Sequence, residues 1–561
     1  MVFLLATPAL VLAGPACRRA EPPSPETPAV HSSGGAVAAC GSGPAPRSGA
    51  PFTPPAGIPV PPFGISELAP PLPDPWKGDA ACFYFVEPDH PNATDDGNPN
   101  GTPSRPRLTI PLDLAAGSQV LLAGSYDRSH ESPDRIRARG TAGRPVFIRG
   151  RSAQERPRIT RPWEVTGSYL VMENLEFADR DRSEAGTLGI EGPSDHVALR
   201  GSELHGNKNA GGLGLGGDGP EVVAEVVLLG NAIHDNGDVN ASFDQDVHGI
   251  AVGRGVQELW VLDNEMWGNS GDGIQINGGR GGEAATHHIY VGRNRSHHNK
   301  QTGFWTKQAS DVVFSENESW GHRPSNSSMG QGMGFQYAPE RVWFLFNHVH
   351  DCDYGIMAAS DDDLGRGADS YYIGNVIHAI HHSQEYNPAT GWSNAAIMLA
   401  GGRNRYLVGN TIHDVDAGIN SPDASGFLHI VDNIVSGVTE RGGHHVFLEL
   451  DETASRSTLR YNLFDRSARI KWGEAEFPTL AAFRARFGEQ SQGSLSADPG
   501  FVSAGRDFRL LAGSPAIDAG VADDVYAVFR SRYGLDISRD AAGMARPQGG
   551  APDLGAYEWK P

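Results

Sequence analysis

Residues 261–269 read Val-Leu-Asp-Asn-Glu-Met-Trp-Gly-Asn, and residues 272–277 continue as Asp-Gly-Ile-Gln-Ile-Asn. Apolar and polar side chains alternate in short runs, which predicts β-strands that bury one face. Gly and Asn separate these runs. Because Asn tolerates a left-handed backbone and hydrogen-bonds neighbouring main chain, a column of Asn side chains could join one layer of strands to the next.

The same phrase recurs along the middle of the chain and delivers Asn, or once Gly, at one repeated point. Successive gaps between these positions, by subtraction, run from 23 to 35 residues. A period of this length with tolerated insertions is typical of a solenoid, in which each repeat buries its apolar side against its neighbours. The positions are Asn174, Gly201, Asn231, Asn264, Asn294, Asn317, Asn347, Asn375, Asn410 and Asn433, with Asn462 as a less regular eleventh.

The phrase predicts a parallel β-helix with two or three strands in each coil, stacked about 4.8 Å apart. No long amphipathic helical pattern interrupts residues 165–470, which argues against alternating strands and helices. These phrases resemble the right-handed parallel β-helix repeat family of the pectin-lyase-like superfamily. The resemblance implies an all-β solenoid of about ten or more coils, with irregular N-terminal coils and a C-terminal cap that contains a short helix.

Composition narrows the classes of partner. The chain has 561 residues, 39% of them apolar, and a formal net charge of −21. That acidity argues against a nucleic-acid binder, which needs a basic face. An acidic protein that acts on a polyanion would need a local basic patch or bound cations. We expect a monomer whose partner is a polysaccharide.

The first 17 residues resemble a secretory signal. Residues 2–16 form an apolar stretch that is too short for a membrane-spanning helix and ends in small residues before Cys17. This end also resembles a bacterial lipobox, although two of its positions depart from the usual pattern. Residues 18–75 are dense in Pro, Ala, Gly and Ser, which predicts a disordered tether. We expect a secreted or cell-surface protein, with an acyl chain on Cys17 as the one route of attachment to an outer membrane.

The two ends of the folded part differ from the repeats of residues 171–470. Residues 80–170 resemble the opening segment of many secreted β-helix proteins and would supply the first irregular coils and a cap. Residues 471–561 resemble the C-terminal module called choice-of-anchor Q, through Gly-Ser-Pro-Ala-Ile-Asp-Ala-Gly at 513–520. We expect this segment, with a short helix at residues 480–487, to cap the solenoid.

The cysteines show no metal-site spacing, so a zinc site built on them is not expected. Export would allow a disulfide bond between Cys40 and Cys82. Cys352 lies inside a repeat and is predicted to be a small core residue.

Rings recur three positions after the repeated Asn. A column of His could bind a metal ion, but stacking of each ring on its neighbour is the favoured alternative. Trp interrupts the column, and no carboxylate is expected in register with it. The positions are His234, Trp267, His297, Trp320, His350, His378 and His413.

Residues 235–248 form an enlarged acidic corner before the strand that begins at Ile250. The corner delivers Asp244, Asp246 and His248, and one coil later Asp272 takes the place of His248. Coils in register would bring these groups within one or two strand spacings. That is close enough for paired-carboxylate catalysis, or for calcium ligation by the three Asp carboxylates. The alternative is a solvated polar turn.

The strand that follows each corner predicts one outward face. Side chains alternate along a strand, so inward Ile274, Phe304, Phe335 and Ile356 define the outward set. We expect an exposed aromatic ring in this set, of the kind that stacks on sugars. The outward residues are Gln275, Asn277, Trp305, Lys307, Gln336 and Met357.

The segment from Lys307 to Asn317 resembles the lysine segment of chondroitinase-B-like alginate lyases. In that family a lysine removes the C5 proton of a uronate, while a metal or an arginine neutralises the carboxylate. The position of the family's next-coil arginine falls at Gln336 or Tyr337 here. Arg341 is near but out of register. An ordinary surface lysine is the alternative for Lys307.

These features predict an exported, carbohydrate-active β-helix enzyme that acts on a polysaccharide by β-elimination or hydrolysis, in a groove between residues 240 and 400. Calcium is the one cofactor that the pattern suggests. The alternative is a non-catalytic surface or glycan-binding solenoid, favoured by the missing arginine. The candidate catalytic residues are Lys307, Asp246, Asp272 and His248, and the candidate substrate-binding residues are Trp305, Gln275, Asn277, Gln336 and Arg341.

Overall fold

The computed structural model of the chain divides into two compact units, residues 1–38 and 39–561. All described residues belong to the second unit. The signal-like segment with Cys17, and residues 18–46 of the predicted tether, lie outside the described residues. The structure describes residues 47–48, 51–72, 82–127, 134–178, 186–208, 211–216, 220–280, 285–359, 369–382, 394–400, 403–422, 426–439, 443–466 and 468–560.

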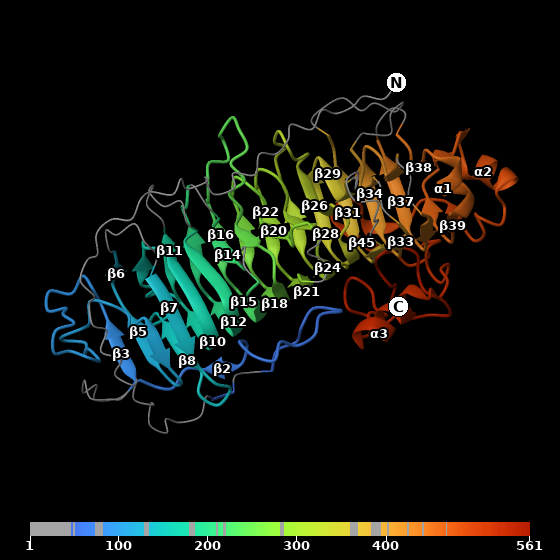
Figure 1. Ribbon diagram of the computed structural model, residues 1–561. Coiled ribbons are helices and arrows are strands. Elements are labelled where there is room, and N and C mark those ends of the chain that lie inside the picture. Colours follow the sequence, from blue (N-terminus) through green and yellow to red (C-terminus); the bar gives the residue numbers. More distant parts are fainter. Residues whose placement is uncertain are drawn as a thin grey trace. The chain divides into compact units, whose positions relative to one another are not determined.

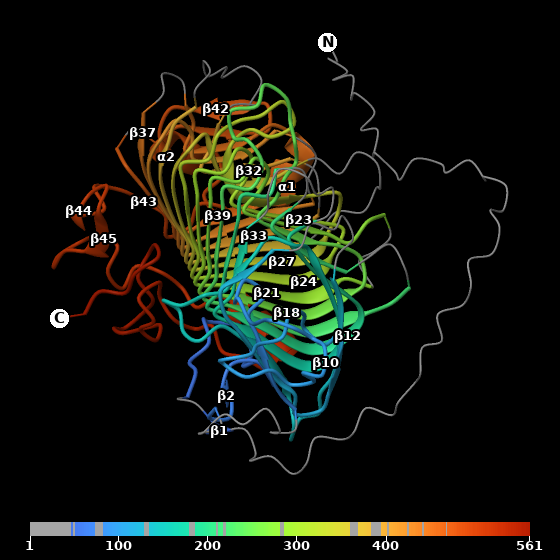
Figure 2. The same cartoon turned by 90° about the vertical axis from the view of Figure 1, so that its left-hand side faces the viewer.

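Each coil of the second unit contributes three short strands, and each strand pairs in parallel with its equivalents one coil before and one coil after (Figure 1). Thus β17 (Ile250–Val252), β18 (Val256–Leu262) and β19 (Glu265–Trp267) follow one another around one coil, and β20 (Ile274–Asn277) begins the next. Figure 2 looks roughly along the stack of coils. The predicted parallel β-helix is therefore confirmed.

We name the three parallel sheets in the order in which a coil visits them, and β10 and β12 run through both the first and the second sheet. The first sheet consists of β4 (Asp113–Ala115), β7 (Asp134–Arg139), the first parts of β10 (Trp163–Glu173) and β12 (Leu188–Arg200), β14 (Leu213–Leu215), β17, β20, β23 (Phe304–Lys307), β26 (Gln331–Gln336), β29 (Tyr354–Ala358), β32 (Ile397–Leu399), β35 (Ile419–Ser421), β38 (Val446–Leu448) and β41 (Ile470–Trp472), with β42 (Ala475–Phe477) antiparallel at its end. The second sheet consists of β3 (Phe83–Val86), β5 (Gln119–Leu122), β8 (Val146–Arg149), the second parts of β10 and β12, β15 (Val223–Leu229), β18, β21 (His287–Gly292), β24 (Ser310–Ser315), β27 (Glu340–Leu345), β30 (Ser370–Ile373), β33 (Arg405–Val408), β36 (Leu428–Val431) and β39 (Thr458–Arg460).

The third sheet has 14 strands, one from each coil that reaches it. They are β6 (Ser125–Tyr126), β9 (Arg158–Ile159), β11 (Glu176–Ala178), β13 (Glu203–His205), β16 (Ala232–His234), β19, β22 (Arg295–His297), β25 (Glu318–Trp320), β28 (His348–Cys352), β31 (Val376–Ile380), β34 (Thr411–Val415), β37 (Ile434–Val438), β40 (Leu463–Phe464) and β43 (Leu495–Ser496). Two antiparallel pairs lie outside the coils: β1 (Arg47–Ser48) with β2 (Glu67–Leu68), and β44 (Phe501–Ser503) with β45 (Asp507–Leu510).

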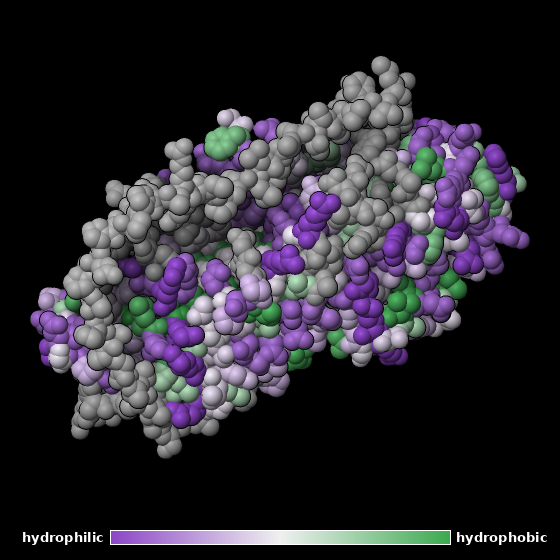
Figure 3. Space-filling model, in the orientation of Figure 1, coloured by the Kyte–Doolittle hydropathy of each residue, from purple (hydrophilic) through white to green (hydrophobic). Residues whose placement is uncertain are grey.

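The interior of the coils is one continuous apolar core. Ile274, Phe304, Phe335 and Ile356 all belong to it, as the alternation predicts, and Cys352 is a buried free thiol within it. Burial raises the pKa of the Cys352 thiol to about 12. On the face seen in Figure 3, hydrophilic side chains predominate and apolar ones form small separate patches. No helix among the described residues is long and apolar enough to span a membrane.

A buried ladder of Asn side chains joins the coils at the corner between the second and third sheets. The Nδ2 atom of Asn264 donates to Oδ1 of Asn294 at 3.0 Å, and the Asn264 backbone N–H donates to the same oxygen at 2.9 Å. The pattern repeats from coil to coil, and Ser202 and Ser494 replace Asn at the two ends. The ladder consists of Asn231, Asn264, Asn294, Asn317, Asn347, Asn375, Asn410, Asn433 and Asn462.

Two of the repeated positions in the sequence lie one residue ahead of this ladder. Asn174 and Gly201 have φ angles of 55° and 57°, and Gly230, just before Asn231, has φ of 63°. The backbone of this position is left-handed in successive coils, which Gly and Asn adopt most readily. The repeated positions listed from the sequence therefore mix two neighbouring positions of the coil. Asn174 and Gly201 occupy the left-handed corner, and the other Asn residues form the ladder.

A second ladder follows the third sheet, and the sequence analysis missed it. Asn236 Nδ2 donates to Asn269 Oδ1 at 2.9 Å, and Asn269 Nδ2 donates to Asn299 Oδ1 at 2.9 Å. Asn207 continues the ladder through its backbone N–H to Asn236. Its members recur only in consecutive coils of this short stretch, so the signal in the sequence is weak.

The predicted disordered tether is wrong for residues 51–72. Ala56, Ile58 and Phe63 are buried against the outer face of the second sheet. Trp260 of that sheet donates a hydrogen bond from Nε1 to Pro59 O at 2.9 Å. The outer face of the second sheet is apolar, so covering it removes that surface from water. We call residues 51–72 the strap.

The predicted disulfide bond concerns Cys40 and Cys82. Cys82 is disulfide-bonded, and Cys40 lies outside the described residues.

The C-terminal part of the chain contains three short helices. α1 (Asp451–Arg456) lies between β38 and β39, α2 (Leu480–Arg486) lies between β42 and β43, and α3 (Val525–Tyr533) follows β45. The sequence predicted α2, whose Phe483 packs on Trp472 and closes the end of the core. Residues 498–560 are not only an end cap. They run back along the outside, where Phe529 of α3 packs on Trp343 of the second sheet and Phe508 packs on the third.

Asp432 connects this returning segment to the coils. Its carboxylate accepts hydrogen bonds from the backbone N–H of Val521 at 3.1 and 3.2 Å, and the residue is 4% exposed. Burial raises the pKa of the Asp432 carboxyl to about 8, although the Val521 N–H and Arg546 act in the opposite direction.

We predict that Asn294→Leu and Asn299→Leu both destabilise the protein. Asn294 donates to Val261 O and Asn317 Oδ1 and accepts from Asn264, and Asn299 is equally buried. Because each substitution leaves buried donors and acceptors unpaired, we expect each to lower the free energy of unfolding by about 2–5 kcal/mol. Urea unfolding monitored by circular dichroism measures the free energy of unfolding of each variant. Exposed Asn326→Leu is the control and should change stability little.

We also predict a pH dependence that comes from Asp432. In the unfolded chain an Asp titrates near about 3.9. The raised pKa in the folded state means that this group stabilises the fold below pH 4, and that its contribution falls as the pH rises to about 8. Asp432→Asn should therefore gain thermal stability relative to the wild type between pH 5 and pH 8. Asp96→Asn, at an exposed site, should follow the wild-type pH profile, and identical profiles for both variants would rule out a buried neutral Asp432.

Candidate functional site

The polar outward residues predicted for the first sheet lie side by side on its outer face. Gln275 of β20 is in register with Trp305 of β23, and Asn277 is in register with Lys307. The next strand places Gln336 of β26 beside Lys307. Neighbouring strands lie about 4.8 Å apart, so these side chains form one continuous polar surface across three coils.

Two further residues meet at the corner that leads into this face. His248 precedes β17, and Asp272 precedes β20 by two residues. The backbone N–H of Asp272 donates to His248 Nδ1 at 2.9 Å, and Asp272 Oδ2 lies 3.5 Å from the same nitrogen. Gln275 Nε2 donates to Asp272 Oδ2 at 2.7 Å. Because Nδ1 accepts a hydrogen bond, a neutral His248 carries its proton on Nε2.

His248 and Lys307 belong to one electrostatic environment. Burial lowers the pKa of His248, Asp272 and Asp246 oppose that shift, and the positive charge of Lys307 adds to it. Of the candidate catalytic residues, His248 and Asp272 are therefore in direct contact.

A basic edge borders the face. Arg254 follows β17, Arg280 follows β20, and Lys307 ends β23, so three successive coils each place a cation at the same edge of the first sheet. Arg254 and Arg280 are exposed, and within the described part of the chain none of the three has an ion pair. Lys307 Nζ lies 6.0 Å from the centroid of the Tyr337 ring. In a chain of net charge −21, this edge attracts anions locally.

Trp305 does not form the exposed sugar platform that the sequence predicted. Its side chain points outward, but the residue is only 5% exposed and packs with Met357 and Met398. A Cβ atom on Gly334 would lie 2.6 Å from the Trp305 ring. Gly334 therefore lets the ring lie against the sheet, where it supports the polar face instead of stacking on a ligand.

The predicted calcium site is not formed, because each carboxylate has separate partners. Asp244 accepts from the backbone N–H of Asn326 at 3.2 Å, and Asp246 accepts from Gln301 Nε2 at 2.6 Å. Asp272 is 2% exposed and bonded as described above. Two groups of three ligand atoms lie within 4.8 Å of one another among the described residues, and neither contains any of these carboxylates.

Arg341, predicted to bind substrate, lies on the second sheet instead. Its guanidinium holds both oxygens of Asp311 at 2.9 Å and pairs with Glu340 at 2.6 Å. Asp311 also accepts from Arg532 and Tyr533 of α3, so this network fixes α3 onto the second sheet. Arg341 therefore has a structural role. It is out of register with Lys307 because the two residues belong to different sheets.

The column of rings on the third sheet stacks as predicted. Centroid distances between neighbouring rings include 4.1 Å for His234–Trp267, 4.4 Å for His297–Trp320 and 5.1 Å for His350–His378. The expectation that no carboxylate lies in register with the column is wrong. Glu residues occur two positions before the rings, on the same outward face, in β13, β19 and β25.

Stacked parallel coils of three strands define the class of this protein as a parallel β-helix. Residues 183–363 match the family model described as "Right handed beta helix region". No curated protein sequence matches the chain.

Among solved structures, the chain is similar to XylC in complex with xylose, at 12% identity with a TM-score of 0.46, over 85% of this chain and 98% of that one. It is similar to pectate lyase Pel9A at 14% identity and a TM-score of 0.42, over 85% of this chain and 96% of that one. The A-module of the Azotobacter vinelandii mannuronan C-5 epimerase AlgE4 matches at 16% identity and a TM-score of 0.37, over 55% and 89%.

The coupling between Lys307 and His248 gives a prediction that does not depend on any activity. Because the Lys307 charge lowers the pKa of His248, Lys307→Met should raise that pKa. An NMR titration of the histidine Cε1–H signals measures the change. Lys471→Met, at a lysine paired with Glu449 near the end of the same sheet, is the matched control and should leave His248 unaffected. An unchanged His248 titration in Lys307→Met would show that the two groups are not neighbours.

Proposed function

We propose that this protein is a polysaccharide lyase that cleaves an acidic glycan by β-elimination on the outer face of the first sheet. The observation that carries the proposal is the basic edge, where Arg254, Arg280 and Lys307 follow one another in three coils and form no ion pair with any described residue. We further propose that the protein is exported to the cell surface, with Cys17 as the site of a lipid anchor.

The chemistry of elimination assigns a role to each group. A base removes the C5 proton of a uronate, the electron pair forms a C4–C5 double bond, and the departing O4 takes a proton from an acid. Lys307, in its free-amine form, would remove the proton, and His248 would present its Nε2–H to the leaving oxygen. Arg254 and Arg280 would balance the negative charge of the uronate carboxylate. They would take the part of the arginine of the alginate lyases, whose position is Gln336 or Tyr337 in this chain.

Hydrolysis receives less support from the same geometry. It needs two carboxyl groups about 5–9.5 Å apart that face the glycosidic bond, one of them able to donate a proton. Asp272 is buried and hydrogen-bonded to Gln275, and Asp246 accepts from Gln301. Asp246 is exposed but Asp272 is not free to face a sugar, so the pair does not meet this requirement and elimination is the better supported reaction.

The second candidate is a non-catalytic glycan-binding solenoid. The observation that favours it is the amide-rich surface of Gln275, Asn277 and Gln336, which offers donors and acceptors to sugar hydroxyls without any catalytic group. The buried Trp305 weighs against it, because sugar-binding surfaces without charge depend on exposed rings.

The test is to incubate the purified protein with alginate, pectate, chondroitin and neutral glycans. Absorbance near 232 nm reports the unsaturated product of elimination, and a reducing-sugar assay reports hydrolysis. We expect elimination on at least one acidic glycan, and a loss of about 100-fold or more in Lys307→Ala. Lys471→Ala should keep full activity. Binding without cleavage would favour the second candidate, and release of reducing ends without absorbance would favour hydrolysis.

A further inference from the structure

The outer face of the third sheet repeats one arrangement with a single variation. His205, His234, His297 and His350 of the stacked column each reach back to the Glu of the preceding coil, as in His234–Glu203 at 3.1 Å and His297–Glu265 at 3.3 Å. At β28 a second imidazole joins the pair. His348 occupies the position that is Arg295 in β22 and Val376 in β31.

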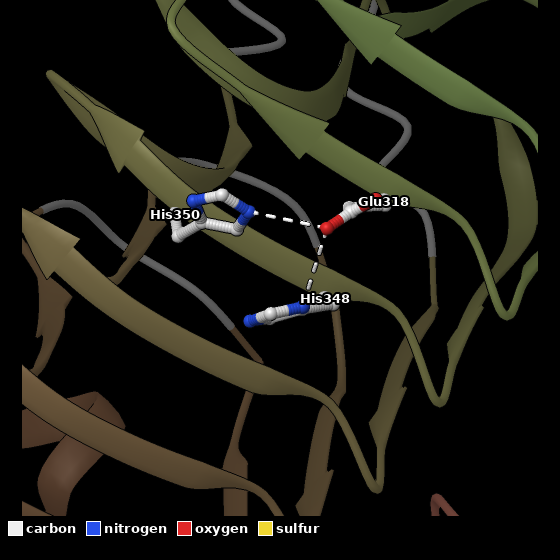
Figure 4. A group of neighbouring side chains, drawn as sticks. All are labelled: Glu318, His348 and His350. Carbon is white, nitrogen blue, oxygen red and sulfur yellow. Dashed lines mark ion pairs between the residues drawn. The ribbon is translucent and has the colours of Figure 1, made fainter. Parts of the chain in front are cut away.

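Glu318, His348 and His350 converge as a result (Figure 4). Glu318 Oε1 lies 3.8 Å from His348 Nδ1 and 3.5 Å from His350 Nε2. The three ligand atoms all lie within 4.8 Å of one another. Ligand atoms on a tetrahedral zinc ion with bonds of about 2.0–2.1 Å are about 3.4 Å apart, so the two distances to Glu318 Oε1 already come close to those of a zinc site. The buried His350 Nε2 has no hydrogen-bond partner.

The outer atoms of all three side chains are already held by other residues. His350 Nδ1 lies 2.7 Å from Asp351 Oδ2, and His348 Nε2 lies 2.9 Å from His378 Nε2. Arg295 Nε donates to the second oxygen of Glu318 at 3.2 Å. Metal-bound imidazoles usually donate their other N–H to such a partner, which fixes the tautomer and leaves the facing nitrogen free to coordinate.

We propose that Glu318, His348 and His350 bind a single Zn²⁺ ion on the third sheet, with one coordination position open to solvent. The side chains of His348 and Glu318 are 42% and 36% exposed, so the ion can enter and a water molecule can complete its shell. Two imidazoles and one carboxylate with a free position are a ligand set that zinc accepts. The site lies on a different sheet from the proposed glycan site and does not depend on it.

The other cluster of three ligand groups among the described residues does not share these properties. His196 supplies its single imidazole, and both of its nitrogens are engaged, with Asp195 at 2.6 Å and Glu225 at 2.7 Å. A metal ion there would have to displace one of these hydrogen bonds. This comparison explains why the proposal concerns β25 and β28 alone.

The test measures zinc content and does not depend on activity. The full-length protein is stripped with EDTA, dialysed against ZnCl2 and assayed by mass spectrometry for zinc bound per chain. The chain has 21 His, so weak zinc binding elsewhere on the protein is expected. The difference in bound zinc between the wild type and each variant therefore tests the proposed site. We expect His348→Asn and Glu318→Gln each to bind one zinc ion fewer than the wild type. Glu265→Gln, the equivalent Glu beside Arg295, should bind as much as the wild type.

A second readout separates ligation from folding. Zinc that binds only the folded state raises the melting temperature in proportion to the logarithm of its concentration. This rise should be present in the wild type and in Glu265→Gln, and reduced in His348→Asn, whose melting temperature without zinc should equal that of the wild type because the side chain is half-exposed. Equal zinc content and equal thermal shifts in wild type, His348→Asn and Glu318→Gln would overturn the proposal.

Discussion

Hydrogen bonding from one coil to the next is the constraint on which the rest of the structure depends. Every strand of the three sheets pairs with the equivalent strand of the adjacent coil, and at the corner the Asn side chains repeat that pairing with Nδ2–H···Oδ1 bonds. Because the ladder is buried, water cannot replace any of its bonds. The register of the coils is therefore fixed, and with it the rows in which outward side chains of different coils meet.

Fixed register gives each outer face its own chemistry. The second sheet carries an apolar face, and the strap and α3 cover it through Phe63, Phe529 and the Asp311 network. The first sheet carries the amide groups of Gln275, Asn277 and Gln336, bordered by the basic edge, whose cations form no ion pair with the described residues. The third sheet carries stacked rings that alternate with carboxylates. One solenoid thus presents two separate polar surfaces, and the two proposals made for them are independent.

The sequence predicted the fold well, because the repeat encodes it locally. Alternation placed Phe304 inside and Lys307 outside, and the ring column stacks as expected. The candidate site was predicted only in part. His248 and Asp272 do meet, since both lie at equivalent positions of adjacent coils. Asp244 and Asp246 accept hydrogen bonds from Asn326 and Gln301, three and two coils on, and these bonds hold the enlarged corner. Corner loops have no period, so no rule of spacing predicts their partners.

The sequence by itself determined which side chains point outward and which coils are neighbours, since both follow from strand alternation and from the period of the repeat. It could not determine what covers a face. Trp305 is outward and yet buried, the strap packs despite a composition typical of a tether, and Arg341 is neutralised by Asp311 beneath α3. Those outcomes depend on contacts between residues far apart in the chain, whose free energy comes from apolar surface and charges that meet only in the folded state.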